Sequence, residues 1–129
     1  MSTVNPRIVR SIYEDVGRGD LATALQSIDD EIEVQEADSL PYAGTYHGRA
    51  GFEHLIGKVF KAWKNLEFSI LEVAGTGDVV FALLELRGLV EPRQEFLAMQ
   101  VVEVWTLRDG KAVGLRPFYW DTAKLARGM

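Results

Sequence analysis

Two acidic residues, Glu36 and Glu103, each interrupt a row of apolar side chains. Glu36 follows Ile32 and Val34 at alternate positions, and alternate residues of a β-strand share one face. Burial disfavours the charged form of a carboxyl group, so a glutamate on an inward face is a stronger proton acceptor near neutral pH than an exposed one. Glu36 is therefore the first candidate for a general base.

Glu103 occupies a similar place on a longer predicted strand. Its face of that strand is otherwise apolar and carries Leu97, Met99, Val101, Trp105 and Leu107. Two carboxyl groups on different strands can meet in one cavity, where one accepts a proton while the other stays protonated and donates a hydrogen bond. The alternative is that both glutamates are structural, for example paired with Arg87 or Arg116, and both interpretations stay open.

Aromatic and amide side chains could complete such a site. Tyr13 lies beside the apolar stripe of the first predicted helix, where its hydroxyl points either into the mouth of a cavity or along the edge of the core. Gln100 is polar within a strand and either binds a ligand carbonyl group or faces solvent. The predicted catalytic residues are Glu36, Glu103 and Tyr13. The predicted substrate-binding residues are Gln100, Trp63, Trp105, Tyr119 and Asp121.

The composition argues against several classes of site and partner. The chain has no cysteine, which excludes thiolate nucleophiles, and its two histidines, His47 and His54, lack a third metal ligand at a suitable spacing. We therefore predict no metal and no cofactor. A formal net charge of −5 without a basic run argues against nucleic acid as a partner. No segment reaches the roughly 20 apolar residues of a membrane span and no signal-peptide pattern is present, so we expect a cytoplasmic protein without membrane contact.

The candidate residues have to be positioned by helices in the first half of the chain and strands in the second. Apolar residues at helical spacing predict three helices, over 5–17, 21–28 and 48–63. Trp63 falls on the apolar stripe of the third helix. Alternation predicts a strand over 31–36, and Pro41 and Gly44 indicate a loop after it. Four strands and a tail helix are predicted over 66–74, 79–90, 94–108, 111–119 and 123–129, with Asp109-Gly110 in the last hairpin.

This order of elements predicts an α+β fold in one domain over 1–129, with helices covering one face of a bent sheet. The strand over 79–90 is apolar on both faces, because Phe81 and Leu83 alternate with apolar residues at 80, 82, 84 and 86. An antiparallel sheet normally leaves one face in water. The second apolar face therefore predicts a homodimer packed sheet to sheet.

Three short strings carry a resemblance to a known family. They lie at 17–21, 41–49 and 104–111 and read Gly-Arg-Gly-Asp-Leu, Pro-Tyr-Ala-Gly-Thr-Tyr-His-Gly-Arg and Val-Trp-Thr-Leu-Arg-Asp-Gly-Lys. With the order of elements, they resemble the SnoaL-like, ketosteroid-isomerase-related branch of the nuclear transport factor 2-like superfamily. The resemblance spans nearly the whole chain. It implies a cone-shaped, curved antiparallel or mixed sheet with the three helices of the N-terminal half on its concave face.

The resemblance also implies roles for individual residues. Glu36 falls where ketosteroid isomerase has its general-base aspartate, and Glu103 falls near the protonated aspartate of that enzyme's oxyanion hole. Ile12 takes the place of the oxyanion-hole tyrosine, and Tyr13 lies one residue away, about 100° round the helix. The acidic pair is therefore present, and the tyrosine is displaced by one position.

The leading hypothesis is a cofactor-independent isomerase or polyketide-cyclase-like enzyme that moves a proton next to the carbonyl group of a small apolar or aromatic ligand. Glu36 would be the base, while Glu103, with Tyr13 or Gln100, would stabilise the enolate-like oxygen. The main alternative is a non-catalytic ligand-binding or dimerisation module, in which arginine or tyrosine neighbours satisfy both acids.

A third hypothesis, ranked lower, is epoxide hydrolysis. Limonene-epoxide-hydrolase-like members of the superfamily use an arginine flanked by two aspartates. Glu85 and Asp121 lie near two of those acidic places, whereas Leu83 occupies the place of the arginine.

Overall fold

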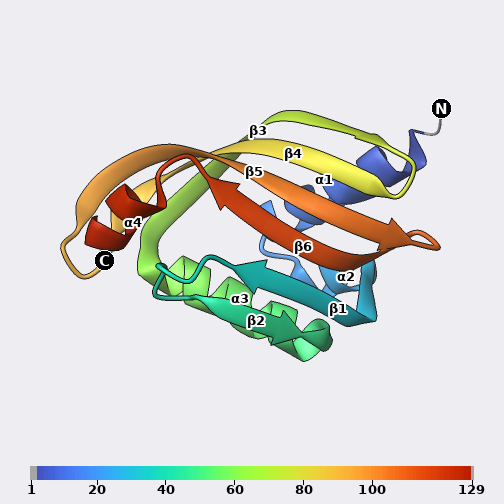
Figure 1. Cartoon of the computed structure of the whole chain (residues 1–129), viewed down its shortest axis with the longest axis horizontal. Coiled ribbons are helices and arrows are strands. Elements are labelled where there is room, and N and C mark those ends of the chain that lie inside the picture. The colour runs from blue at the N-terminus through green and yellow to red at the C-terminus, as the bar shows by residue number, and fades with distance from the viewer. Residues whose placement is uncertain (1–2, 129) are drawn as a thin grey trace.

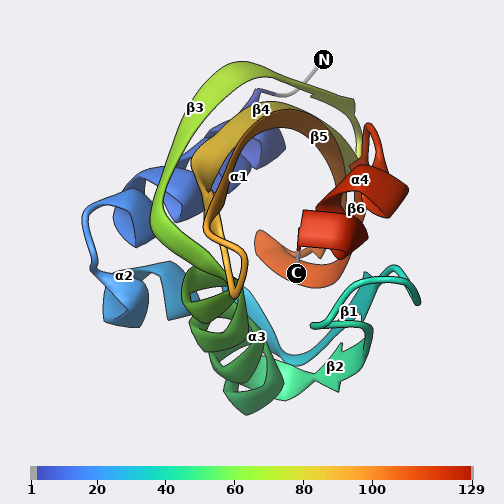
Figure 2. The same ribbon diagram turned by 90° about the vertical axis from the view of Figure 1, so that its left-hand side faces the viewer.

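A six-stranded mixed sheet forms the frame of the computed structural model, which describes residues 3–128 (Figure 1). The strands are β1 (Ile28–Glu36), β2 (Gly44–His47), β3 (Trp63–Thr76), β4 (Val79–Val90), β5 (Glu95–Arg108) and β6 (Lys111–Tyr119). They lie in the order β2-β1-β6-β5-β4-β3, and all neighbours are antiparallel except β1 and β6. Seen from its end in Figure 2, the sheet curls strongly. The predicted α+β class and curved mixed sheet are confirmed.

Four helices accompany the sheet, namely α1 (Val4–Gly17), α2 (Leu21–Leu25), α3 (Gly48–Ala62) and α4 (Thr122–Gly128). α1 buries Val9 and Ile12 and packs against β3 and β4, while α3 buries Phe52 and packs against β1, β2 and β3. The side chain of Asp20 caps α2 by accepting a 3.1 Å hydrogen bond from the backbone N–H of Thr23. None of the helices described over 3–128 is long and apolar enough to cross a bilayer.

Two predicted helix ends were wrong, because in each case the chain joins the sheet at an earlier residue than the predicted end of the helix. Ile28 was expected in the second helix but begins β1, since the carbonyl oxygen of Ser27 accepts a 2.8 Å hydrogen bond from Ala112 of β6. Trp63 was expected on the third helix but begins β3, where it pairs with Val90. Apolar side chains at a helix–strand junction fit either period, so spacing alone does not distinguish them.

The segment predicted as a loop contains the short strand β2. Its four residues pair antiparallel with β1, and Tyr46 lies opposite Val34. Pro41 lies before this strand and Gly44 begins it. Both residue types are typical of turns, so the sequence pattern does not reveal so short a strand. The tail helix was predicted to 129; α4 ends at Gly128, and Met129 lies outside the described residues.

The hairpin prediction at Asp109-Gly110 is confirmed. Both residues have positive φ, 52° and 77°, as a two-residue hairpin turn requires and as glycine tolerates without strain. This turn sets the antiparallel pairing of β5 with β6, in which Glu103 lies opposite Pro117. The last two strands are thereby held beside β1, which pairs with β6.

The two faces of the sheet differ in burial. On β4 the residues facing the helices are buried, namely Val80, Ala82, Leu84 and Leu86. Phe81 and Phe118, on the opposite face, are 49% and 54% exposed. The core therefore lies between the concave face and the helices, and the convex face keeps large apolar side chains in contact with solvent.

Candidate functional site

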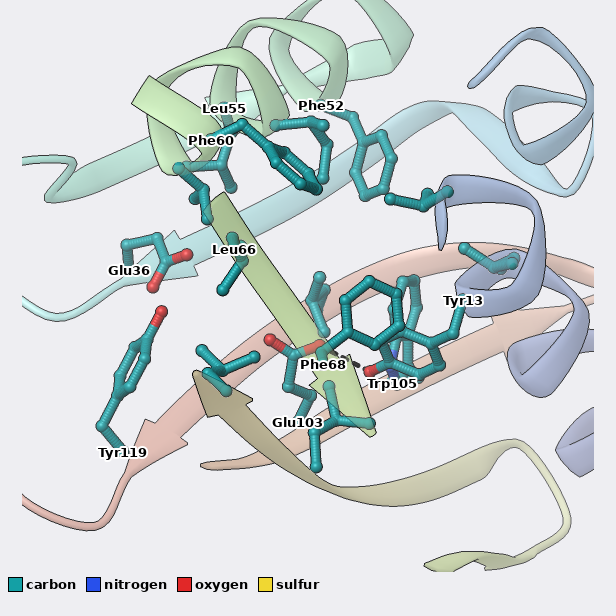
Figure 3. Close-up of a pocket in the computed structure, with 17 residues that line it drawn as sticks. Tyr13, Glu36, Phe52, Leu55, Phe60, Leu66, Phe68, Glu103, Trp105 and Tyr119 are labelled. Atoms are coloured by element: carbon teal, nitrogen blue, oxygen red, sulfur yellow. Dashed lines mark hydrogen bonds between the residues drawn. The ribbon is translucent and has the colours of Figure 1, made fainter. Parts of the chain in front are cut away.

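A pocket lies between the concave face of the sheet and helices α1 and α3 (Figure 3). α3 contributes five apolar side chains to it, Phe52, Leu55, Ile56, Val59 and Phe60. The polar groups come from α1, β1, β5 and β6, which supply Tyr13, Glu36, Glu103, Trp105 and Tyr119. Five of the predicted site residues thus surround one cavity, although they are far apart in the sequence.

Glu36 is the last residue of β1 and points into this pocket. Its side chain lies on the buried face with Ile32 and Val34, and only 7% of its surface is exposed. Its Oε1 atom is buried and has no hydrogen-bond partner among the described residues. Burial, reinforced by the nearby Glu103, raises the pKa of Glu36 from 4.5 to about 9.

Glu103 reaches the same pocket from the middle of β5. Its Oε1 accepts a 2.5 Å hydrogen bond from the hydroxyl of Tyr13 on α1. Burial raises the pKa of Glu103 to about 7, and the hydrogen bond from Tyr13 opposes that rise because it stabilises the carboxylate. The two glutamates are therefore a coupled pair of weak acids that face one apolar space.

Tyr13 is held in place by two hydrogen bonds and two aromatic neighbours. Its hydroxyl oxygen accepts a 2.7 Å hydrogen bond from the indole N–H of Trp105 and donates to Glu103. Its ring meets those of Trp105 and Phe68 edge on, at centroid distances of 5.7 and 6.1 Å. Because a tyrosine has one hydroxyl proton, Tyr13 bonded in this way cannot also donate to an enolate-like oxygen. The geometry makes it a positioning residue for Glu103.

Tyr119 belongs to a second chain of hydroxyl groups. Its oxygen lies 2.8 Å from that of Tyr42, which in turn accepts a 3.4 Å hydrogen bond from the indole of Trp63. Figure 3 shows the Tyr119 hydroxyl pointing toward the carboxyl group of Glu36. Burial raises the pKa of Tyr42 and of Tyr119, so both stay protonated. Trp63 does not line the pocket. Its contact with this group of residues is the hydrogen bond to Tyr42.

Tyr42 is a residue that the sequence reasoning missed. It lies in the segment between β1 and β2, where residues are usually exposed, yet it is almost completely buried. In the sequence, Tyr42 is marked by its place in the string at 41–49, which carries part of the family resemblance. No local periodicity in that segment indicates which side chains turn inward.

Within residues 3–128 no lysine, arginine or histidine pairs with Glu36 or Glu103. The described residues that line the pocket include no lysine, arginine or histidine. Arg87 pairs with Glu85 at 2.8 Å, and Arg116 donates a hydrogen bond to Gln35 on the surface. Among the described residues no guanidinium group caps either glutamate, whereas the hydroxyl of Tyr13 is a hydrogen-bond partner of Glu103.

Besides Trp63, two predicted substrate-binding residues lie outside the pocket. Gln100 is exposed on the convex face, and it borders a separate surface hollow together with Trp120 and Asp121. The Asp121 carboxylate accepts a 2.9 Å hydrogen bond from the backbone of Lys124 at the start of α4. Alternation explains the position of Gln100, since it is an odd number of residues from Glu103.

The acidic residues proposed for epoxide hydrolysis are also outside the pocket. Glu85 lies in an ion pair with Arg87 on the convex face, and Leu83 lies on that face as well. His47 and His54 are exposed. Within residues 3–128 no group of three or more histidine, cysteine, aspartate or glutamate side chains is arranged to hold a metal ion.

Glu36 and Tyr119 also border a second hollow, which opens on the outside of the molecule. This outer hollow is lined by polar residues that include Gln35, Asp38 and Arg116. Glu36 and Tyr119 thus border both an apolar interior space and a polar exterior space.

Comparison with known proteins assigns the family. A family model described as the SnoaL-like domain matches residues 9–115, which is most of the chain. The chain belongs to the SnoaL-like family. The sequence resemblance to this family is confirmed, and no curated protein matches the chain closely enough to add a function.

Solved structures show the same fold for this SnoaL-like protein. An NTF2-like protein of unknown function from Burkholderia pseudomallei is 26% identical, with a TM-score of 0.87 over 98% of this chain and 97% of that one. An NTF2-like protein from Burkholderia thailandensis is also 26% identical, with a TM-score of 0.88 over 100% and 98%. TerC, co-crystallised with polyporic acid, is 21% identical, with a TM-score of 0.83 over 96% and 98%.

Proposed function

We propose that this SnoaL-like protein is a cofactor-independent, cytoplasmic single-domain enzyme. It binds a small apolar or aromatic carbonyl compound and moves a proton at the carbon next to the carbonyl group, as an isomerase or a polyketide-cyclase-like enzyme does. One observation carries this proposal: two carboxyl groups with raised pKa values face the same apolar pocket without a basic partner. TerC, which has the same fold, was co-crystallised with polyporic acid, and this supports an organic ligand for the present protein.

The proposed step uses the pair as one base and one acid. The Glu36 carboxylate takes the proton from the carbon next to the carbonyl, and the electron pair of that bond moves onto the carbonyl oxygen. Protonated Glu103 donates a hydrogen bond to the developing oxyanion. The proton then returns to another carbon, as in an isomerase, or the enolate attacks a second carbonyl group, as in an aldol-type cyclase.

A second assignment exchanges the two roles. Because the pKa of Glu103 is about 7 and that of Glu36 about 9, Glu103 is the first of the pair to lose its proton as pH rises. The hydrogen bond from Tyr13 favours the Glu103 carboxylate further. Under this assignment Glu103 is the base and Glu36, whose Oε1 has no partner, donates to the substrate oxygen. Both assignments use the pair with one proton bound, so they give the same pH profile, and the variants Glu36→Gln and Glu103→Gln distinguish them instead.

The test is exchange of the hydrogens next to a carbonyl group. A panel of small ketones with an aromatic ring, including β-tetralone, is incubated with the protein in heavy water. Deuterium uptake by the ketones is followed by NMR. We expect the wild-type protein to accelerate exchange, and Glu36→Gln to remove at least about a hundredfold of that acceleration, as typical general acid–base contributions predict. Glu85→Gln, which changes an acid on the convex face, is the matched control. Equal rates for wild type and Glu36→Gln would rule out Glu36 as the base, and equal rates in Glu103→Gln as well would rule out the proposal.

A measurement of ketone binding distinguishes the proposed enzyme from the non-catalytic ligand-binding module. Glutamine keeps the shape of glutamate, so Glu36→Gln should bind β-tetralone about as well as the wild type by NMR titration. A wild-type protein that binds these ketones without exchanging their hydrogens would favour the ligand-binding module. A protein that neither binds nor exchanges them would contradict both functions.

We also propose a homodimer through the convex face of the sheet. An outer apolar patch spans three neighbouring strands, because Phe81 lies opposite Val104 and Val102 lies between Leu83 and Phe118. Phe81 and Phe118 are half exposed, and large exposed apolar patches on soluble domains are typical of interfaces. A second copy of the chain offers the same apolar surface in return. Light scattering that gives the mass of one chain would contradict the dimer.

A further inference from the structure

The pocket can hold two negative charges and offers no positive charge to balance them. Of the described residues that line it, Glu36 and Glu103 are the only acids, and none is basic. The side chain of Glu36 is 93% buried and points into this space, and its Oε1 has no hydrogen-bond partner among the described residues. A buried carboxyl oxygen without a partner costs free energy that a donor or a cation in the pocket would recover. A ligand that carries both an N–H donor and positive charge would supply what the two acids lack in this pocket.

The walls around this acidic pair suit an organic cation. Six of the residues that line the pocket are aromatic, namely Tyr13, Phe52, Phe60, Phe68, Trp105 and Tyr119. The rings of Phe52, Trp105 and Tyr13 follow one another, with centroids 6.5 and 5.7 Å apart. Aromatic faces attract ammonium groups, and the apolar residues of α3 offer contact area for the hydrocarbon part of a ligand. An inorganic cation would leave those apolar walls without contacts.

We infer that the pocket binds apolar amines in their ammonium form, with the charged nitrogen between Glu36 and Glu103 and the aryl or alkyl part against α3. The inference shares with the proposed function the assumption that this pocket receives a ligand. It does not require that the protein catalyses a reaction. It adds a ligand class, the arylalkylamines, that the carbonyl chemistry does not include.

Protons must leave the pocket when an ammonium ion enters. The titratable groups that face the two acids are Tyr13 from α1 and Tyr119 from β6, with Tyr42 behind Tyr119; α3, β3 and β4 contribute only apolar side chains. Burial keeps these tyrosines protonated, so the proton comes from a glutamate. Binding of a cation therefore releases protons, and affinity rises with pH until the amine itself loses its proton, near the range of lysine at about 10.4.

The experiment compares phenethylamine with phenethyl alcohol, which has the same shape and no charge. Isothermal titration calorimetry near neutral pH, in two buffers of different ionisation enthalpy, gives both the affinity and the number of protons released. We expect phenethylamine to bind at least about tenfold more tightly than the alcohol and to release protons. The amine-to-alcohol ratio should grow as pH rises. This comparison uses the wild-type protein alone, so it does not depend on the folding of any variant.

Variants of the two glutamates then test whether the ammonium group binds between them. Glu36→Gln and Glu103→Gln should each lower the affinity for phenethylamine at least about tenfold and leave that for phenethyl alcohol within about twofold, while Glu85→Gln changes neither. Equal affinities of the amine and the alcohol in the wild type would overturn the inference, and so would equal losses of both in the variants. Amine binding without ketone exchange would remove only the proposed function. Ketone exchange without a preference for amines would remove only this inference.

Discussion

The hydroxyl group of Tyr13 lies between the indole of Trp105 and the carboxyl group of Glu103, and it is bonded to both, at 2.7 and 2.5 Å. The bond to Glu103 connects helix α1 to strand β5 across 90 residues of sequence. It stabilises the charged form of Glu103 against the effect of burial, so the pKa of Glu103 is about 7 while that of Glu36 is about 9. The unequal acidity of the pair depends on this tyrosine.

Tyr13→Phe should raise the pKa of Glu103 above 7, because the variant removes the hydrogen bond that lowers it. Carbon NMR of labelled glutamate carboxyl groups measures this directly. The free energy of unfolding should fall by about 1–3 kcal/mol, since the Trp105 N–H is left without a partner in the core. An unchanged Glu103 titration would show that the Tyr13 bond does not set the acidity of the pair.

The stability of the wild-type protein should decrease as pH rises from about 5 to 9. Glu36 and Glu103 bind protons more tightly when folded than when unfolded, so their contribution to stability is complete below their ordinary pKa of 4.5 and is lost as pH rises toward about 7 and 9. The slope reaches up to about 1.4 kcal/mol per pH unit for each group. Denaturant unfolding at a series of pH values measures it, and Glu36→Gln should flatten the upper part of the curve. A wild-type stability that is level across this range would be inconsistent with two buried acids.

Glu36→Leu should make the protein more stable and inactive. The substitution removes a buried oxygen that has no partner and replaces it with an apolar side chain of similar size. We expect the free energy of unfolding to rise by about 1–3 kcal/mol and the exchange of ketone hydrogens to be lost. Thermal and denaturant unfolding, with the exchange assay, test both parts. A less stable Glu36→Leu protein would mean that Glu36 has a structural partner that the pocket geometry does not reveal.

Tyr42→Phe should affect the pocket indirectly, through Tyr119. Without the Tyr42 hydroxyl, Tyr119 loses its 2.8 Å partner and the Trp63 N–H loses its acceptor. We expect a loss of about 1–3 kcal/mol in stability and a broader set of Tyr119 orientations, seen as line broadening of its ring signals in NMR. Tyr119→Phe, which keeps the ring and removes the pocket hydroxyl, is the matched comparison. Sharp, unshifted Tyr119 signals in Tyr42→Phe would contradict this positioning role.

A charge placed on the outer apolar patch should separate the proposed dimer. Phe118→Glu puts a carboxylate at a half-exposed position beside Val102. We expect light scattering to report a mass that falls from two chains to one, while circular dichroism stays unchanged. Lys61→Glu, at an exposed position on α3, should leave the mass as it is. Retention of the dimer in Phe118→Glu would assign the interface to another surface.

Much of the fold could be predicted because alternation and helical spacing are strong in this chain. The inward direction of Glu36 followed from Ile32 and Val34, which share its face and are fully buried. The same rule places Gln100 on the opposite face from Glu103, and Gln100 is exposed there. Asp121 follows the end of β6, so no alternation applied to it.

The hydrogen bonds of the site could not be predicted. The partners of Tyr13 lie 90 and 92 residues away, and which atoms meet depends on how α1 packs against the sheet rather than on local spacing. Tyr42 lies outside regular structure, and its burial results from packing against Trp63 and Tyr119. Trp63 fitted both a helix and a strand pattern, so its role behind the pocket was concealed as well.

Glu36 and Tyr119 line both the inner pocket and the outer hollow, and this has a consequence for isotope labels. Under the proposed function, a proton taken from a substrate carbon by Glu36 would lie close to the polar outer hollow. Exchange of that proton with bulk water before its delivery would remove the label from the product. The share of a substrate's label that survives a turnover would then report how closely Glu36 communicates with solvent.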